Sequence, residues 1–414
     1  MTASAELSPV EVVARWDVVS VYQPVVDLRT GRTVGCEALA RGARGSGLES
    51  PAELFAAAAA ADDVHELDWQ CRLAAVRGLG DTTVPPGSLL LVNVEPTALE
   101  HPDTAWVGLL AAEARRRGWQ LAVEITERQV SDDPACLLAF RRRLRAENVL
   151  LAIDDVGADP ASLAMMPLLE PDIVKLDMRL VQARPSMDIA RILAAVNAEA
   201  TRSGCLVVAE GIETAEQSEI AASMGARLGQ GWWFGRPGAL PVADGIAPLT
   251  VAELARPRVD MLHTRTPWDL VRHEPSVRRG AKPLLAAMSE YIEDQALIGD
   301  ATAVLVGAFQ HRDYVKPRVV RRWSELAGGT HLTAMIAELL DDAPAAGLRA
   351  ASIAASDPLR HEWTVALITA HHGVALVAHD VGDTGAEADR RFDFVVTYDR
   401  EVALKVCRRL TAYL

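Results

Sequence analysis

The sequence predicts an α/β protein built as a (β/α)8 TIM-like barrel followed by a smaller α/β (α+β) domain. Three observations predict this fold class. Short apolar runs alternate with helix-forming stretches from residue 18 to about residue 235. Runs of this length, bounded by turn residues, suit strands that are buried on both faces of a sheet. The chain has 414 residues, which leaves room for a barrel of about 250 residues and a second domain.

Eight apolar runs supply the strands expected for the barrel. Each run carries a polar or acidic residue toward its end, and a stretch of helix formers follows most of them. In chain order the runs are VVSVYQPVVDL, TVGCEALAR, SLLLVNVE, LAVEITE, LLAIDDVG, DIVKLD, CLVVAEGIE and ARLGQGWWFG. Strand and helix in alternation imply parallel strands joined by helical crossovers. No glycine-rich phosphate loop follows the first run, which argues against an open dinucleotide-binding sheet.

Prolines interrupt this alternation beyond Pro237, so we expect a barrel over 1–245 and a partly helical connector over 246–281. A second pattern over 282–414 predicts the smaller domain. PLLAAMSEYIEDQ reads as an amphipathic helix, ATAVLVGAFQ as a strand and EVALKVCRRLTAYL as a closing helix. WTVALITAHHGVALVAHD predicts a hairpin that turns at His372–Gly373.

The charge of the chain limits the kinds of binding partner that we expect. Lys and Arg number 42 against 56 Asp and Glu, so the formal charge is −14. Such a surface repels duplex nucleic acid and anionic membranes, and we expect neither as a partner. The N-terminus lacks the pattern of a signal peptide, and the five cysteines form no C-x-x-C pair. We therefore expect reduced thiols and a cytoplasmic protein.

Polar side chains stand at the ends of the expected strands, where the active sites of such barrels lie. In chain order they are Glu37, Asn93, Glu124, Asp154, Asp155, Lys175, Glu210 and Gln230. Oxygen ligands without His or Cys select hard cations, here Mg²⁺ or Mn²⁺. Two metals bridged by an aspartate would hold an attacking water and a phosphoryl oxygen. The pattern predicts metal-dependent cleavage of a phosphodiester, and the metals would let an acidic protein bind an anion.

A plainer interpretation exists for each of these residues taken singly. An acidic residue after a strand is usually a helix cap or a loop residue, and Asp154–Asp155 could be an Asx turn. Neither explains the repetition at successive strand ends, nor Lys175 within an apolar run. A buried lysine needs an anionic partner. The arginine run 141–143 is interpreted as a solvated helix face.

The region from Val21 to Pro237 resembles the EAL-type cyclic di-GMP phosphodiesterases. The segments that carry the likeness are YQPVVDLRTGRTVGCEALAR, NVEPTAL, VEITE, IDDVG, VKLD, VAEGIET and GQGWWFGRP. They occur in family order and at family-like intervals. The resemblance implies a two-metal Mg²⁺ or Mn²⁺ enzyme that hydrolyses cyclic di-GMP to linear pGpG. It also implies a homodimer formed through the barrel.

The resemblance assigns roles to individual residues. The metal ligands it implies are Glu37, Asn93, Glu124, Asp154, Asp155 and Glu210. Glu210 is implied as ligand or general base, and Lys175 as the residue that orients the nucleophilic water. The substrate-binding positions it implies are Gln23, Leu39, Arg41 and Gln230, the last of them near the catalytic water. Glu127 matches the residue that anchors the loop after Asp155, and Glu213 matches the second acid of the VAEGIE segment.

The loop after Asp155 departs from the family pattern DDFGTGYSSL, because here it reads DDVGADPASL. Asp159 replaces a glycine and Pro160 a tyrosine, and a proline stiffens its own backbone and restricts the residue before it. Two hypotheses follow: an enzyme that turns over cyclic di-GMP, or a receptor that binds it and cleaves it poorly. Glu95 stands where the family often has serine. It adds a carboxylate to the site if the strand continues past Asn93, and is a loop residue if the strand has ended.

The C-terminal region resembles the DICT-type sensory domains that are appended to cyclic di-GMP enzymes and two-component proteins. AMSEYIEDQ, VLVGAFQ and the paired strands near the end carry this likeness. The resemblance implies a sensory domain that regulates the enzyme and has a ligand or partner that the residues do not name.

Overall fold

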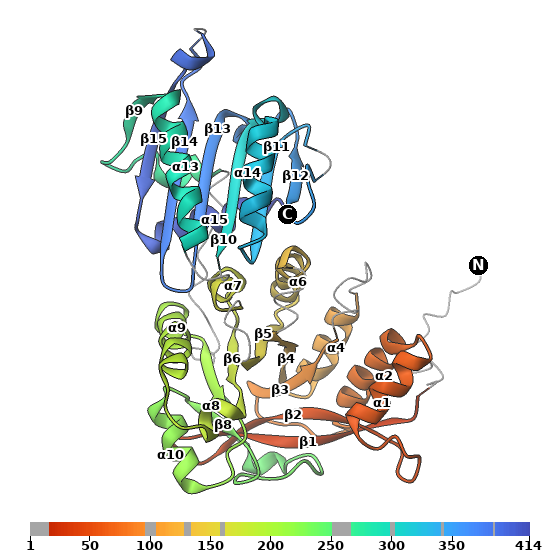
Figure 1. Cartoon of the computed structure of the whole chain (residues 1–414). Coiled ribbons are helices and arrows are strands. Elements are labelled where there is room, and N and C mark those ends of the chain that lie inside the picture. Colours follow the sequence, from red (N-terminus) through yellow and green to blue (C-terminus); the bar gives the residue numbers. More distant parts are fainter. Residues whose placement is uncertain are drawn as a thin grey trace, which may run out of the picture. The chain divides into compact units, whose positions relative to one another are not determined.

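The computed structural model of the chain (Figure 1) describes residues 16–95, 105–127, 134–157, 162–250, 266–298, 303–340, 343–383 and 386–414. Residues 251–265 of the connector, which was expected to be partly helical, lie outside these ranges. So do Asp159 and Pro160 of the loop that follows Asp155.

Eight strands close into a barrel in chain order, which confirms the predicted fold class. They are β1 (Val18–Asp27), β2 (Thr33–Gly42), β3 (Ser88–Asn93), β4 (Trp119–Thr126), β5 (Leu150–Val156), β6 (Ile173–Leu176), β7 (Leu206–Ala209) and β8 (Leu228–Gln230). Every residue of β6, β7 and β8 is buried, as expected for strands covered on both faces. Where β2 meets β3, a Cβ on Gly35 would lie 2.2 Å from the Leu89 carbonyl oxygen, so only glycine fits there.

The expectation of an all-parallel barrel is wrong for β1, which runs antiparallel to both β2 and β8. The link between β1 and β2 is too short for a helical crossover, which needs a dozen or more residues. Instead the chain turns back, and the Asp27 carboxylate accepts hydrogen bonds from the backbone N–H groups of Arg29 (3.0 Å) and Thr30 (2.9 Å). The antiparallel register places Gln23 directly opposite Glu37.

Helices connect the remaining strands of the barrel. They are α1 (Pro51–Ala60), α2 (Val64–Arg77), α4 (Ala105–Arg116), α6 (Pro134–Ala146), α7 (Ser162–Leu169), α8 (Met178–Gln182), α9 (Met187–Ser203) and α10 (Ala215–Ser223). Polar side chains cap the N-termini of three of these helices. The side chains of Ser50, Ser186 and Thr214 each accept a hydrogen bond from a backbone N–H in the first turn of the helix that follows.

The arginine run of α6 is not a fully solvated face. Arg141 is 4% exposed and pairs with Asp172 at 2.8 Å. Its guanidinium also donates to the carbonyl oxygens of Leu169 (3.1 Å) and Glu170 (2.8 Å), at the end of α7. The interpretation of residue 141 as solvated is therefore wrong, whereas Arg142 and Arg143 are exposed.

Packing with the barrel continues past residue 245. Ile246 pairs with Thr33 in a parallel bridge, and the Ala247 N–H donates to the Thr33 carbonyl oxygen at 2.8 Å. Ile246 and Leu249 are both 3% exposed. The first residues of the expected connector are thus part of the barrel's packing.

The second domain is a seven-stranded mixed sheet in the order β12-β11-β10-β13-β14-β15-β9. Its strands are β9 (Arg278–Ala281), β10 (Val304–His311), β11 (Leu332–Glu338), β12 (Arg349–Ile353), β13 (Glu362–Ile368), β14 (Gly373–Asp380) and β15 (Arg391–Thr397). β10, β11 and β12 pair in parallel, and the other pairs are antiparallel. The predicted hairpin is β13–β14, although its turn occupies residues 369–372, because Gly373 already pairs with Ile368.

Among the residues described for this domain, four α-helices pack on the sheet: α12 (Pro267–Val271), α13 (Lys282–Ile298), α14 (Pro317–Ala327) and α15 (Arg400–Thr411). The helices α13 and α14 lie side by side over the sheet (Figure 1) and contribute Leu285, Ile292 and Trp323 to its core. Two elements of the expected connector, α12 and β9, belong to this domain: α12 contacts β13, β14 and α15, and β9 pairs with β15.

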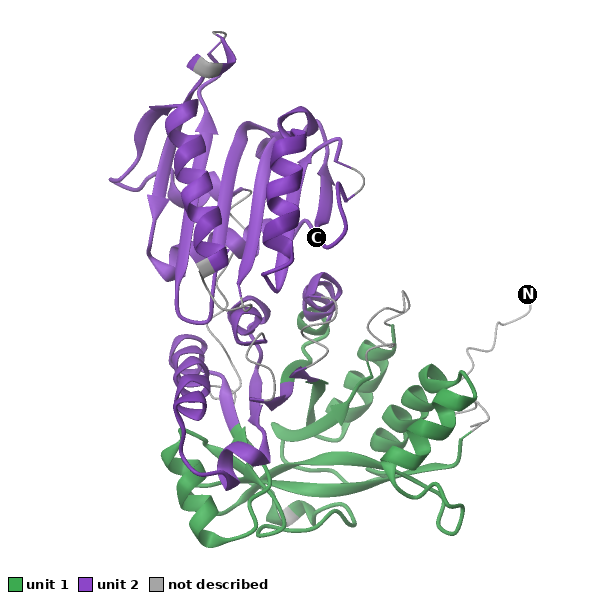
Figure 2. Ribbon diagram, viewed as in Figure 1, with its two compact units in different colours: residues 1–125, 144–152, 208–254 green, residues 126–143, 153–207, 255–414 purple. Residues whose placement is uncertain are grey.

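The chain divides into two compact units (Figure 2). Unit 1 comprises residues 1–125, 144–152 and 208–254, which include β1 to β3 and β8. Unit 2 comprises residues 126–143, 153–207 and 255–414, which include β6, α7 to α9 and the second domain.

Candidate functional site

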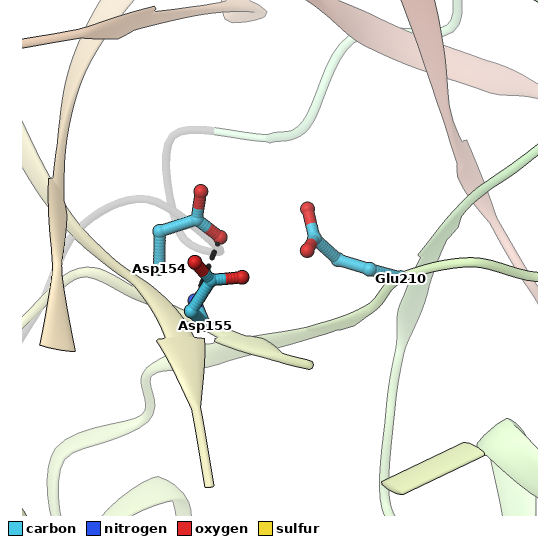
Figure 3. Close-up of side chains that lie close together, drawn as sticks. All are labelled: Asp154, Asp155 and Glu210. Atoms are coloured by element: carbon cyan, nitrogen blue, oxygen red, sulfur yellow. Dashed lines mark hydrogen bonds between the residues drawn. The ribbon is translucent and has the colours of Figure 1, made fainter. Parts of the chain in front are cut away.

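Three carboxylates meet at the ends of β5 and β7 (Figure 3). Asp154, Asp155 and Glu210 each offer a carboxylate oxygen, and these three atoms lie within 4.8 Å of one another. Within the residues that the structure describes, this acidic cluster is the one group of three or more acidic, His or Cys side chains found with spacing that could hold a metal ion. Its donors are all oxygen, which is the chemistry that Mg²⁺ and Mn²⁺ prefer.

The backbone at Asp155 explains how two consecutive side chains reach one cluster. Successive side chains on a strand point to opposite faces. At Asp155 the chain turns into the left-handed region (φ 57°), which aspartate tolerates better than most residues. The Asp155 N–H donates to Asp154 Oδ1 at 2.9 Å and holds the turn. Both carboxylates are therefore brought toward Glu210 (Figure 3).

Lys175 on β6 forms an ion pair with one carboxylate of this cluster. Its side chain is 0% exposed, and its Nζ lies 3.1 Å from Asp154 Oδ1. Asp154 thus supplies the anionic partner that a buried ammonium requires.

The acidic cluster carries electrostatic strain. Partial burial, then repulsion from Asp154 and Asp177, raise the pKa of the Asp155 carboxyl. Like charges held this close favour a bound cation, which would relieve the repulsion. Asp177 was not among the sequence-predicted residues. It is 7% exposed, caps the start of α8 and ends the VKLD segment, so its position at a strand end was the available signal.

A second set of predicted residues forms a hydrogen-bonded group around Glu37, which we call the Glu37 network (Gln23, Glu37, Asn93 and Gln230). Glu37 is 6% exposed, and its two carboxylate oxygens accept from Asn93 Nδ2 (2.8 Å) and Gln230 Nε2 (2.6 Å). Gln230 Nε2 also donates to Gln23 Oε1 at 3.1 Å. The two amides fix the orientation of the carboxylate. Glu124 is 1% exposed and lies beside Asn93 in the pairing of β3 with β4.

Glu127 joins the two ends of the loop that follows Asp155. Its carboxylate accepts from the Gly157 N–H, at 3.2 Å for both oxygens, and from the Ser162 hydroxyl. Glu127 is 1% exposed. Residues 158–161 between these contacts lie outside the described part of the chain.

The remaining predicted residues make no contact with either set that the structure specifies. Leu39 and Arg41 are half-buried on β2, two and four residues beyond Glu37 and so on the same face of that strand. Glu213 is exposed, and its N–H donates to the Gln217 side chain at the start of α10. Glu95 follows the end of β3, so the loop alternative is the correct one for this residue.

No helix within the described ranges has the length and apolar character needed to cross a membrane.

Two family models match the chain. The model described as "EAL domain" matches residues 11–237, which is more than half of the chain. The model described as "Sensory domain in DIguanylate Cyclases and Two-component system", or DICT, matches residues 270–381. Both regions are those in which the sequence showed the corresponding resemblance.

Curated relatives resemble the first of these regions. The chain is 30% identical over 232 residues to "Probable cyclic di-GMP phosphodiesterase PdeN" of Escherichia coli strain K12, covering 54% of this chain and 43% of the relative. It is 29% identical over 231 residues to "Probable cyclic di-GMP phosphodiesterase PdeB" of the same strain, covering 55% of this chain and 44% of the relative. The chain thus spans less than half the length of these two relatives.

Among solved structures, the Klebsiella pneumoniae BlrP1 calcium/cy-diGMP complex is 31% identical, with a TM-score of 0.46, over 55% of this chain and 57% of that one. The PaMucR phosphodiesterase c-di-GMP complex is 26% identical, with a TM-score of 0.46, over 54% of this chain and 92% of that one.

Proposed function

This chain belongs to the EAL domain family, and on that premise we propose that it is a cytoplasmic, Mg²⁺- or Mn²⁺-dependent phosphodiesterase that hydrolyses cyclic di-GMP to linear pGpG. The observation that carries the proposal is the acidic cluster of Asp154, Asp155 and Glu210 with the buried Lys175 beside it. The names of the curated relatives support the choice of substrate.

In this proposal the acidic cluster, together with Glu37, Asn93 and Glu124, holds two divalent cations. Bound cations supply Lewis acidity to the phosphodiester and lower the pKa of water. Glu210 accepts the proton of the attacking water as general base or serves as a ligand. Lys175 keeps the Asp154 carboxylate in place and orients the water, while the substrate contacts Gln23, Leu39, Arg41 and Gln230.

The Glu37 network supports this assignment in a specific way. Asn93 and Gln230 each place an amide N–H on the Glu37 carboxylate, so its lone pairs are held in fixed directions. Hydrogen bonds from neighbouring groups orient metal-binding carboxylates in the same manner.

A receptor that binds cyclic di-GMP without efficient cleavage is the second candidate, and the DDVGADPASL sequence favours it. The double substitution Asp159→Gly and Pro160→Tyr restores two family residues and separates the two candidates. If the chain is an enzyme, the unaltered chain already cleaves cyclic di-GMP, and the variant cleaves it at a different rate. In the receptor account only the variant gains cleavage.

We further propose that the second domain is a sensory domain that regulates the barrel. Contacts of α15 support this. Arg408 donates to the Pro167 carbonyl oxygen through Nε (3.2 Å) and Nη2 (2.5 Å), and its Nη1 lies 2.7 Å from Glu170 Oε1. Both partners stand at the end of α7.

The start of α7 is tied to the acidic cluster. Ser162, the first residue of α7, donates to Glu127, which also accepts from Gly157, two residues after Asp155. A change in α15 would therefore reach the loop that follows the two aspartates.

Replacing Arg408 with alanine in the full chain tests this coupling. We expect turnover of cyclic di-GMP to fall by about fivefold or more, which is the lower end of typical coupling between sites. Lys405→Ala is the matched control, since within the described residues Lys405 on the same helix makes no ion pair. Equal rates in the two variants, measured well below their unfolding temperatures, would remove α15 as the route of regulation.

A further inference from the structure

The second domain contains a cavity of about 1170 Å³ that the proposed phosphodiesterase activity does not use. It lies among the first turns of α13 and α14 and the strands β10, β13 and β14. Its size slightly exceeds the range of about 300 to 1,000 Å³ that is typical of cavities that bind small organic ligands. The two helices over it are those that lie side by side in Figure 1.

One wall of the cavity is apolar. Phe309 on β10 and Trp363 on β13 are directly paired across the sheet, and both line the cavity together with Ala286 and Val319. Trp363 is half-buried. Aromatic side chains at such a wall offer a flat surface to the apolar body of a ligand.

One end of the cavity is positively charged. Lys282 begins α13, and Lys316 and Arg318 flank the start of α14. Neither helix has an acidic residue in its first turn, so the positive ends of both helix dipoles add to these cations. In the described part of the chain, Lys316 and Arg318 make no ion pair.

The carboxylates at that end are already neutralised. Asp380 pairs with Arg390, and Glu387 pairs with Lys282 and, at 3.4 Å, with Arg390. Asp313, which also lines the cavity, lies 3.2 Å from His311 Nδ1. The four cations Lys282, Lys316, Arg318 and Arg390 therefore outnumber the three carboxylates Asp313, Asp380 and Glu387. Burial first, then the positive charges of Arg390, Lys316 and Arg318, lower the pKa of Lys282 to about 8 even though Asp380 acts in the opposite direction. The balance of charge favours an anion at this end.

Arg390 at this end of the cavity is buried, and hydrogen bonds fix its side chain. It is 9% exposed and donates to Tyr314 Oη at 2.6 Å and to Gln310 Oε1 at 3.3 Å. Gln310 itself is 7% exposed and has a left-handed backbone (φ 62°) at the point where the pairing of β10 with β11 shifts register. Such conformations are costly, and they often mark positions where the fold aims a side chain at a ligand.

The opposite end of the cavity has no such excess of positive charge. Glu290, two turns further along α13, lines the cavity there, and Arg322 pairs with Glu293 at 2.5 Å. The cavity is thus polarised along α13 and α14, with the excess of positive charge at the helix starts.

We propose that this cavity binds an organic anion of about nucleotide size, with the acidic group of the ligand at Lys316 and Arg318 and its apolar body against Phe309 and Trp363. The inference does not depend on the phosphodiesterase activity, because the charges and the wall that carry it belong to the second domain alone.

Fluorescence titration of the full chain tests the proposal with two probes of similar shape. The anionic probe is 1-anilino-8-naphthalenesulfonate, and the uncharged one is N-phenyl-1-naphthylamine. Arg318→Glu reverses the charge of an exposed residue that lines the cavity. Arg321→Glu makes the same change on an exposed position of α14 that does not line the cavity. Arg318 is also exposed, so neither change disturbs the core.

We expect the sulfonate to bind the unaltered chain and Arg321→Glu equally, and Arg318→Glu at least tenfold more weakly. The uncharged probe should bind all three chains alike. Ala286→Trp, which places a large side chain in the cavity against its apolar wall, should weaken the binding of both probes. Equal binding of the sulfonate by the two charge-reversal variants would overturn the assignment of an anion, and binding unaffected by Ala286→Trp would overturn the cavity as the site.

Discussion

Replacing Glu210 with alanine is expected to reduce the rate of cyclic di-GMP cleavage by roughly 10²- to 10⁴-fold, the contribution typical of a general base. A general base acts on the barrier more than on ground-state affinity, so binding of the dinucleotide should largely persist. If Glu210 is mainly a ligand, binding will fall as well and cleavage will respond less to metal. Turnover is followed by chromatographic detection of pGpG, and binding by calorimetry.

Glu219→Ala is the matched control for this variant. Glu219 is an exposed carboxylate on α10, nine residues after Glu210, and it lies outside the acidic cluster. Glu219→Ala should cleave cyclic di-GMP at the same rate as the unaltered chain. Cleavage by Glu210→Ala at the unaltered rate would contradict both roles proposed for Glu210.

Saturating Mg²⁺ or Mn²⁺ is expected to raise the unfolding temperature of the chain. A ligand that binds only the folded state at a hundred times its dissociation constant stabilises that state by about 2.7 kcal/mol. For the barrel this corresponds to a shift of roughly 5 to 10 °C. The physical reason is the repulsion within the acidic cluster, which also raises the pKa of Asp155. Differential scanning calorimetry with metal and with chelator measures the shift.

Asp154→Asn should abolish that rise. The amide keeps an oxygen near Lys175 but removes the charge that the buried ammonium faces, so the variant will also start from a lower unfolding temperature. The informative quantity is therefore the shift on adding metal rather than the temperature itself. Asp81→Asn, at an exposed position, controls for the loss of one negative charge. A variant Asp154→Asn that still gains the full shift would place the metal elsewhere.

The strands of the barrel were predictable because each is an apolar run that ends in a polar residue, and burial on both faces demands that pattern. The direction of β1 was missed, although the short segment between its run and the next was visible in the sequence. Likewise Arg141 looked like its exposed neighbours, since its partner Asp172 lies in the loop before β6 and only tertiary packing buries the pair.

Some features of the candidate site were likewise predictable from the sequence, and others depend on the fold. Its residue types could be predicted, and the acidic cluster and the Glu37 network were both assembled from predicted residues. The expected strand-end position is wrong for Glu37, which lies in the middle of β2. The hydrogen bond from Gln230 to Gln23 could not be predicted, because it depends on the reversal of β1. The left-handed backbone at Asp155 carries no signal in composition or periodicity. The cavity of the second domain was equally invisible, since its lining comes from several distant segments.

The most direct test of the proposed function is the conversion of cyclic di-GMP by the purified chain with Mn²⁺ and, in parallel, with chelator. The proposal predicts that linear pGpG accumulates over many turnovers with Mn²⁺ and that none forms when the metal is removed. Cyclic di-GMP that binds the chain and stays intact for hours in the presence of Mn²⁺ would contradict it and identify the chain as a receptor.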